Sequence, residues 1–418
     1  MKIAVIASEF YPSIGGIGQN FNNMCKVFRN NKEHTLYIFN HFYKGKNIFD
    51  VLDKNRYSLK DLNIILKNRR LYYFFLLIWK ILIKKKIRTS FKLKMILYLL
   101  IRLRDTLKIL TNISSIYPYL NKINADIIMG SDCSGSMVPL VFLFSQIFHK
   151  KGICYGHGTD FLVHSHWSLK SYFLRLLNKI ILSNKKMKEL IKKINHLEED
   201  QLTIIPYGLY LDNYKIQESK KQLREKLGFP LDEFIIISVG RHAPRKNFEM
   251  VIEAMKILKE NHTNKKFKYL LIGHGSETPR LKELVIDLHL KDDVVFLGGF
   301  SGMRKNEFIK ASDVLVMPSI ATNKTVEGFG IVFLEANFYK IPVIGTRSGG
   351  IIEAIHHNKS GLLINNLNEL VKAILYLYDN EEERKRMGEY GHNRVINKYN
   401  WNLLVNEYIK VFEDIRKE

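Results

Sequence analysis

The stretch that decides the fold of this chain is Glu327-Gly328-Phe329-Gly330-Ile331-Val332-Phe333-Leu334-Glu335-Ala336. Two glycines precede an apolar run that is typical of a helix, and seven residues separate Glu327 from Glu335. Glycine adopts a positive φ without steric cost and lets a ligand approach the backbone. The first amides of a helix have no partner inside it and carry a partial positive charge, which favours a bound phosphate. We therefore predict a phosphate-binding loop, with Glu327 and Glu335 holding two parts of one ligand.

Three other loops of similar character surround this stretch in the sequence. Each includes or follows a short apolar run that is typical of a buried strand. They are Val239–Asn247, which contains Arg241, Arg245 and Lys246, then Leu271–Gly275, and Asp313–Ser319. In an open parallel sheet, ligands bind beyond the carboxyl ends of the strands. We expect these loops to gather at one such edge.

Alternation of short apolar runs with longer segments continues through most of the chain, and it predicts βαβ units with parallel sheets. A length of 418 residues exceeds what one hydrophobic core usually serves, so two domains are expected. The polar segment 208–228 is the expected linker. The expected strands are 3–7, 36–39, 125–129, 152–155, 180–182 and 202–205 in the amino half, and 234–239, 269–272, 294–297, 314–317 and 341–344 in the carboxyl half.

Together these motifs resemble the family 4 retaining glycosyltransferases of the GT-B fold, or glycosyl transferases group 1. The resemblance is dense from Phe234 to Gly361. Upstream, Tyr11–Gly18 resembles the family's first glycine loop and Tyr155–Asp160 its histidine segment, whereas Tyr207 stands where the family usually has asparagine. The resemblance implies an α/β protein with two Rossmann-like parallel-sheet domains facing each other across a cleft. Residues 1–208 would form the acceptor-side domain and 209–390 the sugar-nucleotide domain, with a terminal helix in 391–418 crossing back.

The resemblance also implies a role for each motif residue. Arg241 and Lys246 would contact the donor diphosphate, with Arg245 as a further cation nearby. Glu335 would accept hydrogen bonds from the ribose hydroxyls, Glu327 would lie at the donor sugar, and His157 would lie against the same sugar. The catalytic residues are thus expected to be His157 and Glu327. The donor-binding residues are expected to be Gly16, Arg241, Lys246, Gly328, Phe329, Gly330, Ile331 and Glu335.

Negative charge develops on the leaving phosphate in such a reaction, and preorganised donors stabilise it. No Asp-x-Asp motif occurs in the sequence, so we expect neither a metal ion nor a cofactor, and basic side chains would take the metal's place. The donor would be a UDP- or GDP-linked sugar. Retention of configuration would follow from attack on the face from which the phosphate departs, with a phosphate oxygen taking the acceptor proton.

Half of the formal net charge of +24 lies between Lys67 and Lys108, where thirteen Lys or Arg stand against Asp105 alone. Aromatic and aliphatic runs alternate with these charges, and each run is too short to span a bilayer. Such a tract suits contact with an anionic membrane surface. Two alternatives remain open: the apolar runs are core helices of the amino domain, or the charge reflects the lysine-rich composition. No nucleic-acid-binding motif is present, so nucleic acid is not an expected partner.

Three widely spaced cysteines, Cys25, Cys133 and Cys154, suit a reducing compartment and offer no metal-binding pattern. The start of the chain reads as a buried strand and lacks the features of a signal peptide. We expect a cytoplasmic protein, peripheral at the inner face of the cell membrane. Its acceptor would be a lipid-linked or oligosaccharide precursor of lipopolysaccharide or capsule. A sugar-nucleotide epimerase of the same fold and a non-catalytic binding or scaffold subunit are the alternatives.

Overall fold

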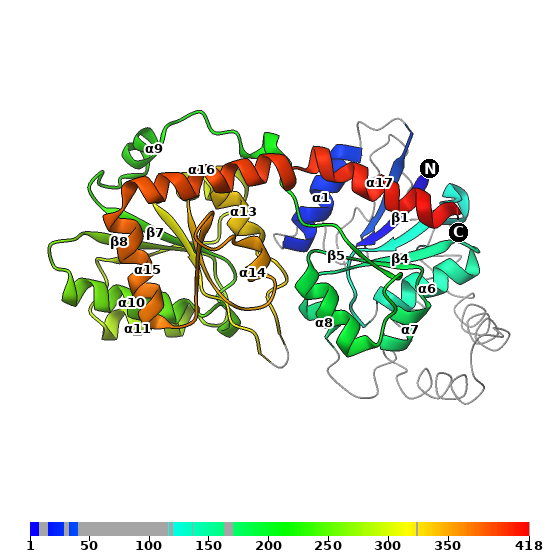
Figure 1. The fold of residues 1–418 in the computed structure, drawn as a ribbon, viewed down its shortest axis with the longest axis horizontal. Helices are drawn as coiled ribbons and strands as arrows, with labels where there is room; N and C mark the ends of the chain where they lie inside the picture. Colours follow the sequence, from blue (N-terminus) through cyan, green and yellow to red (C-terminus); the bar gives the residue numbers. More distant parts are fainter. Residues whose placement is uncertain are drawn as a thin grey trace, which may run out of the picture. The chain divides into compact units, whose positions relative to one another are not determined.

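The computed structural model describes residues 1–7, 16–28, 33–40, 116, 120–135, 137–162, 170–322 and 325–417. The chain divides into two compact units. The amino-terminal unit comprises Met1–Ser183, Lys188–Ile205 and Val405–Glu418, and the carboxyl-terminal unit comprises Asn184–Met187 and Pro206–Leu404. Figure 1 shows that each unit is a sheet flanked by helices. The basic tract 67–108 lies outside the described residues, so its predicted membrane contact stays a prediction.

The amino-terminal unit contains a parallel sheet of six strands in the order β2-β1-β3-β4-β5-β6. Its strands are almost wholly apolar because helices cover a parallel sheet on both faces. Ile3 to Ala7, for example, are all fully buried. The strands are β1 (Lys2–Ala7), β2 (Thr35–Asn40), β3 (Ile127–Gly130), β4 (Lys151–Gly156), β5 (Lys179–Leu182) and β6 (Leu202–Ile204). The helices are α1 (Gly16–Phe28), α6 (Met137–Ile147), the 3-10 turn η2 (Thr159–Phe161), α7 (Lys170–Leu176) and α8 (Lys185–Asn195).

The carboxyl-terminal unit contains a second parallel sheet of six strands, in the order β12-β11-β10-β7-β8-β9. Counted from the first strand of this unit, the order is that of a Rossmann sheet, and the direction of winding reverses between β7 and β10. The strands are β7 (Phe234–Val239), β8 (Phe267–Ile272), β9 (Val294–Gly298), β10 (Val314–Met317), β11 (Val343–Thr346) and β12 (Gly361–Ile364). The sequence therefore predicted the α/β class and both parallel sheets correctly.

Helices cover both faces of the second sheet, with α10 and α15 packed together on one face and α13 and α16 on the other (Figure 1). The helical segments are η3 (Leu211–Tyr214), α9 (Lys220–Leu227), η4 (Pro244–Lys246), α10 (Phe248–Asn261), α11 (Thr278–Asp287), α12 (Gly302–Ala311), α13 (Ile331–Phe338), α14 (Ile351–Ala354), α15 (Leu367–Asp379), α16 (Glu381–Lys398) and α17 (Trp401–Lys417). From Val405 onward, α17 belongs to the amino-terminal unit, where Phe412 packs against Phe28.

The structure differs from the sequence prediction at several element boundaries. The sequence analysis missed β12, because its apolar run is short and follows a lysine and a serine. The segment expected to be a linker contains α9, whose start is capped by Ser219 and Gln222 in a capping box. Residues 391–398 continue α16, and the terminal helix α17 follows at Trp401.

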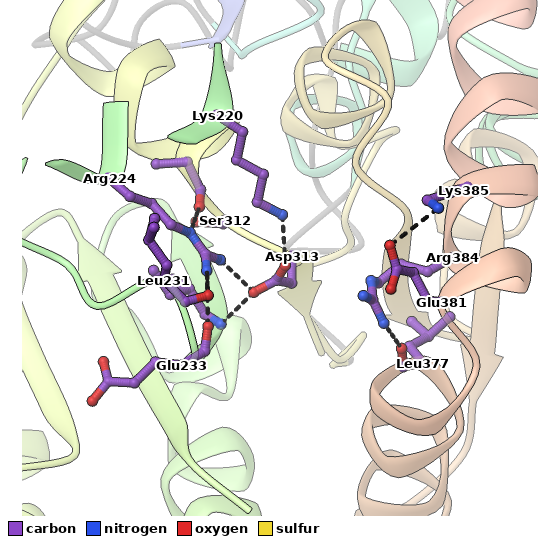
Figure 2. Close-up of polar contacts among 12 residues, drawn as sticks. Lys220, Arg224, Leu231, Glu233, Ser312, Asp313, Leu377, Glu381, Arg384 and Lys385 are labelled. Atoms are coloured by element: carbon purple, nitrogen blue, oxygen red, sulfur yellow. Dashed lines mark hydrogen bonds and ion pairs between the residues drawn. The ribbon is translucent and has the colours of Figure 1, made fainter. Parts of the chain in front are cut away.

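A buried ion cluster joins α9 to the amino ends of β7 and β10 in the carboxyl-terminal unit. Figure 2 shows Lys220 and Arg224 converging on Asp313, each with a nitrogen 2.5 Å from a carboxylate oxygen. The backbone amide of Ile235 donates to the same carboxylate at 2.7 Å. Burial alone would raise the pKa of Asp313, but the two cations outweigh burial and lower it. Asp313 therefore anchors the end of the sheet opposite the loops that were expected to bind ligand.

Candidate functional site

The loop after β7 meets the loop after β10 at the point where the winding of the second sheet reverses. Arg245 Nη1 donates to Glu327 Oε2 at 2.5 Å, and Lys246 Nζ donates to the same oxygen at 2.6 Å. The side chains of Lys246 and Glu327 are 12% and 13% exposed. A reversal of this kind places ligands outside the carboxyl ends of the strands in α/β proteins. The structure thus brings a predicted sugar-contacting carboxylate together with a predicted phosphate-contacting lysine.

The electrostatics of this cluster favour an anion. Burial alone would raise the pKa of Glu327, but Lys246 and Arg245 overcome that effect and lower it to about 2. Burial lowers the pKa of Lys246, the charge of Glu327 opposes that change, and the positive charges of Arg245 and Arg241 add to the lowering. Arg245 and Lys246 face the one carboxylate of Glu327, and Arg241 acts on Lys246, so positive charge is in excess. The cluster can therefore accept a group with more than one negative charge.

Glycines fix the position of the loop that carries Arg241, Arg245 and Lys246. A Cβ atom on Gly273 would lie 1.9 Å from the carbonyl oxygen of Gly240, and one on Gly275 would lie 2.3 Å from that of His242. The amide of Gly240 donates to Ile272 O at 2.9 Å, and the amide of His242 donates to His274 O at 3.1 Å. The motif Ile272-Gly273-His274-Gly275 thus has a steric role, because its glycines let two loop backbones lie in direct contact.

The start of α13 is open, as the sequence predicts. Gly330 is its N-cap with a φ of 84°, and no side chain caps the helix there. Within the described loop 325–330, Gly328 does not share the positive φ that the sequence allows for both glycines. Ile331 is the first helical residue and is partly exposed. The side chain of Phe329 is instead 1% exposed, so only its backbone is placed to meet a ligand.

A second glycine pair holds the backbone of Glu327 and Gly328. The amide of Gly350 donates to Glu327 O at 2.9 Å. A Cβ atom on Gly349 would lie 2.5 Å from that oxygen, and one on Gly350 would lie 1.8 Å from the oxygen of Gly328. The sequence analysis did not single out this pair, although the Ser-Gly-Gly run after an apolar strand was a visible signal.

Glu335 lies one turn further along α13 and is 1% exposed. Its Oε1 accepts a hydrogen bond from the hydroxyl of Tyr214 at 2.9 Å, and its Oε2 accepts one from Lys305 Nζ at 2.5 Å. Sequence reasoning missed both partners, because they come from η3 and α12. One signal was available for Lys305, since it shares the buried face of α12 with Phe308 and Ile309. A lysine on such a face is seldom there without a partner.

His157 belongs to the amino-terminal unit, at the end of β4. Its Nε2 lies 2.6 Å from Ser131 O, and a carbonyl oxygen only accepts, so Nε2 carries the proton. The Asp160 carboxylate accepts hydrogen bonds from the amides of Cys133, His157 and Gly158 at 2.7 to 2.9 Å. Asp160 thereby holds the loop around the histidine in shape. Gly16 is the first residue of α1 in the same unit, and the loop before it lies outside the described residues.

The described part of the chain contains neither a metal-binding cluster nor a membrane-spanning helix. Among those residues, there is no group of three or more His, Cys, Asp or Glu that is arranged to hold a metal ion. Their helices also include none with the length and apolar character needed to cross a membrane.

Residues 219–394 match the sequence family described as glycosyl transferases group 1. The N-acetyl-alpha-D-glucosaminyl L-malate synthase of Bacillus anthracis is 29% identical over 215 residues, which are 51% of this chain and 54% of that protein. An uncharacterised glycosyltransferase of Methanocaldococcus jannaschii is 26% identical over 99% of both chains. The matches to three of the curated relatives span only 38% to 59% of those proteins.

Solved structures show the same architecture over the whole chain. The crystal structure of HepE from Anabaena, in complex with UDP, aligns with a TM-score of 0.68, at 16% identity, over 99% of this chain and 100% of that one. An identity this low supports a common fold and nothing more specific. The match of residues 219–394 covers less than half of the chain and agrees with the resemblance to the glycosyl transferases group 1, and each unit has the Rossmann-like parallel sheet of a GT-B fold.

Proposed function

We propose that this chain is a retaining glycosyltransferase that moves a sugar from a nucleotide-sugar donor to a glycolipid or surface-polysaccharide precursor. The contact of Arg245 and Lys246 with Glu327 beside the open start of α13 carries the proposal. It supplies fixed positive charge and backbone amides for a diphosphate, and a carboxylate for sugar hydroxyls, in one place. The complex of HepE with UDP supports a nucleotide diphosphate as the ligand, because the two proteins share a fold.

In the proposed reaction, the bond between the sugar C1 and the β-phosphate oxygen breaks. Lys246 and Arg245 stabilise the charge that develops on the leaving phosphate, and each such preorganised donor contributes about 3 to 4 kcal/mol. Glu327 is then released from the two cations and accepts hydrogen bonds from the sugar. The acceptor hydroxyl attacks C1 on the face from which the phosphate leaves, and its proton passes to a phosphate oxygen. No metal ion is required, because the cluster itself carries the positive charge.

The remaining roles are proposals that rest on the resemblance. His157, held by Asp160 and Ser131, would contact the donor sugar. The basic tract 67–108 would hold the protein at the inner face of the membrane, where a lipid-linked acceptor is found. UDP- and GDP-linked sugars are the proposed donors.

A binding screen without metal tests the donor site. Purified protein in a chelating buffer would be heated with UDP-, GDP-, ADP- and dTDP-sugars, and the shift in melting temperature recorded. A ligand at 100 times its dissociation constant stabilises the folded state by about 2.7 kcal/mol. We expect one nucleotide class to respond. Lys246→Met should abolish the response, whereas Lys256→Met, which removes a partly exposed lysine paired with Glu260, should preserve it.

The product of a responding donor then identifies the reaction. Transfer to a lipid or oligosaccharide acceptor with retained anomeric configuration, read by nuclear magnetic resonance, is the expected result. Inverted configuration would refute the retaining mechanism, and an epimerised nucleotide sugar without transfer would identify an epimerase. A folded protein that responds to none of the nucleotides would overturn the donor site and favour a scaffold role.

A further inference from the structure

Lys305 is a charged residue on a helix face that otherwise packs into the core. It lies on the face of α12 that packs inward, and its side chain is 11% exposed. Its ammonium is 2.5 Å from Glu335 Oε2, and Glu335 is more deeply buried still, with its side chain 2% exposed. Burying such a pair gives no general gain in stability over apolar residues of the same size. The pair therefore calls for an explanation other than packing.

Polar groups surround this pair on the carboxylate side. Tyr214 donates to Glu335 Oε1, and the hydroxyl of Tyr339 donates to Tyr214 O at 2.7 Å. Asn306 lies beside Tyr339, and among the described residues its Oδ1 is a buried acceptor without a hydrogen-bond partner. A buried polar atom of this kind destabilises the fold unless a ligand or water satisfies it. Its presence beside the pair supports a ligand that brings a hydrogen-bond donor.

The pair offers complementary chemistry to a vicinal diol. Each hydroxyl of a diol donates one hydrogen bond and also accepts hydrogen bonds, whereas a carboxylate only accepts and an ammonium only donates. One of the three N–H groups of Lys305 points to Glu335. Its other two N–H groups make no hydrogen bond to the described residues, so they remain for hydroxyl oxygens. Lys305 is the more exposed member of the pair.

The position of the pair along α13 fits a nucleotide. Glu335 follows the open helix start at Ile331 by four residues, which is a rise of about 6 Å along the axis. A diphosphate at the helix start would place its ribose at about this depth. This spacing agrees with the contact between Glu335 and the ribose hydroxyls that the family resemblance implies.

We propose that Lys305 and Glu335 together bind the ribose 2′-hydroxyl by hydrogen bonds. The chain would therefore prefer ribonucleoside diphosphate sugars to 2′-deoxyribonucleoside diphosphate sugars such as dTDP-sugars. The inference rests on the proposed function and adds a specificity-determining residue to the same site. A nucleotide that lacks the 2′-hydroxyl covers Lys305 and Glu335 without forming the hydrogen bonds that this hydroxyl would make with them. A site built to bind a hydroxyl rejects the analogue that lacks it for this reason.

The test compares dissociation constants for the best-binding nucleoside diphosphate and its 2′-deoxy counterpart, by calorimetry on the full chain. Wild type should prefer the ribonucleotide by about 10-fold to 100-fold, the range for one hydrogen bond to a charged group. Lys305→Met should lose most of that preference, and Lys305→Arg should keep part of it. The matched control is Lys310→Met on the same helix, whose ammonium donates to Ile216 O at 2.9 Å and should leave the preference unchanged.

Each result separates this inference from the proposed function. Equal loss of affinity for both nucleotides in Lys305→Met, with the preference intact, would show a purely structural lysine and overturn the inference alone. An absence of preference in wild type would do the same. A folded wild type that binds no nucleotide would overturn the proposed function and the inference with it. If Lys305→Met does not fold, Lys305→Gln keeps a neutral donor and tests the same preference.

Discussion

Among single residues, Glu327 has the most strongly constrained surroundings at the candidate site. Without a ligand, it serves as the internal counter-ion of Arg245 and Lys246 and keeps both side chains in place. A diphosphate would take over this role when it binds. A resting site that is already charged and oriented needs little reorganisation, which is what electrostatic stabilisation of a leaving group requires.

The protonation of Glu327 predicts a pH dependence of stability. The pKa of this carboxyl falls from its ordinary 4.5 to about 2 in the folded chain. The charged form therefore stabilises the fold above about pH 4.5, and this contribution is lost as the pH falls towards 2. Each pKa unit corresponds to about 1.4 kcal/mol. Denaturant unfolding between pH 7 and 2 should show a smaller acid-dependent loss in Glu327→Gln than in wild type.

The pH series of unfolding measurements includes a control for the loss of a carboxylate that has no special surroundings. Glu260→Gln removes a carboxylate from an exposed pair on α10 and should follow the wild-type profile. We also expect Glu327→Gln to be less stable than wild type at pH 7, because two partly buried cations lose their counter-ion. Parallel profiles for Glu327→Gln and wild type would contradict the ion pairs described here.

Among the elements, the loops after β7 and β8 depend on each other. The contact between them has no room for a side chain at Gly273, whose φ of 136° is also one that other residues rarely adopt. The arrangement positions Arg241, Arg245 and Lys246 through backbone contact rather than through side-chain packing. A loop held in this way keeps its shape when its own side chains exchange partners.

Substituting Gly298 and Gly273 with alanine distinguishes the cost of backbone strain from the cost of a steric clash. Gly298 has a φ of 81° with open space around its Cβ position, so Gly298→Ala should cost only the strain, about 1 to 2 kcal/mol. Gly273→Ala adds a contact of 1.9 Å with Gly240 O and should cost clearly more. It should also weaken nucleotide binding, since the loop must shift. Equal losses in the free energy of unfolding would show that the two loops move apart freely.

At the scale of the whole molecule, two sheets with separate cores carry the described residues. In the carboxyl-terminal unit, the Asp313 cluster stands at one end of the sheet and the candidate site at the other. Arg224 is 5% exposed and also donates to the carbonyl oxygens of Ala311, Leu231 and Glu233. Its guanidinium thus joins α9 to the end of α12 and to the segments that precede β7 and β10 (Figure 2).

Removing that guanidinium should destabilise one unit more than the other. Arg224→Met leaves Asp313 with one cation fewer in a buried place, which costs about 3 to 5 kcal/mol. Lys226→Met on the same helix removes an exposed lysine that pairs with Glu218 and Glu307, and it should destabilise the unit much less. Hydrogen exchange should show lost protection in β7 to β12, with β1 to β6 little changed. Equal loss in both sheets would show that the units unfold together.

The strands could be predicted because parallel strands are buried on both faces and appear as short apolar runs. Phe234–Val239 and Val314–Met317 match β7 and β10 residue for residue. Boundaries that depend on capping or on tertiary contact were harder to predict, as α9 and β12 show. The open helix start at Gly330 also followed from local sequence, since its conformation depends on glycine and on the residues beside it.

The sequence by itself determined which residue types gather at the carboxyl ends of the strands, because a parallel sheet brings successive loops to one edge. It could not determine which of them touch. The pairing of Glu327 with Arg245 and Lys246, and of Glu335 with Lys305 and Tyr214, joins residues between 30 and 121 positions apart. Such pairs depend on strand order and on the angle at which helices pack. Only the tertiary structure decides them, because no local pattern records the distance between two loops in space.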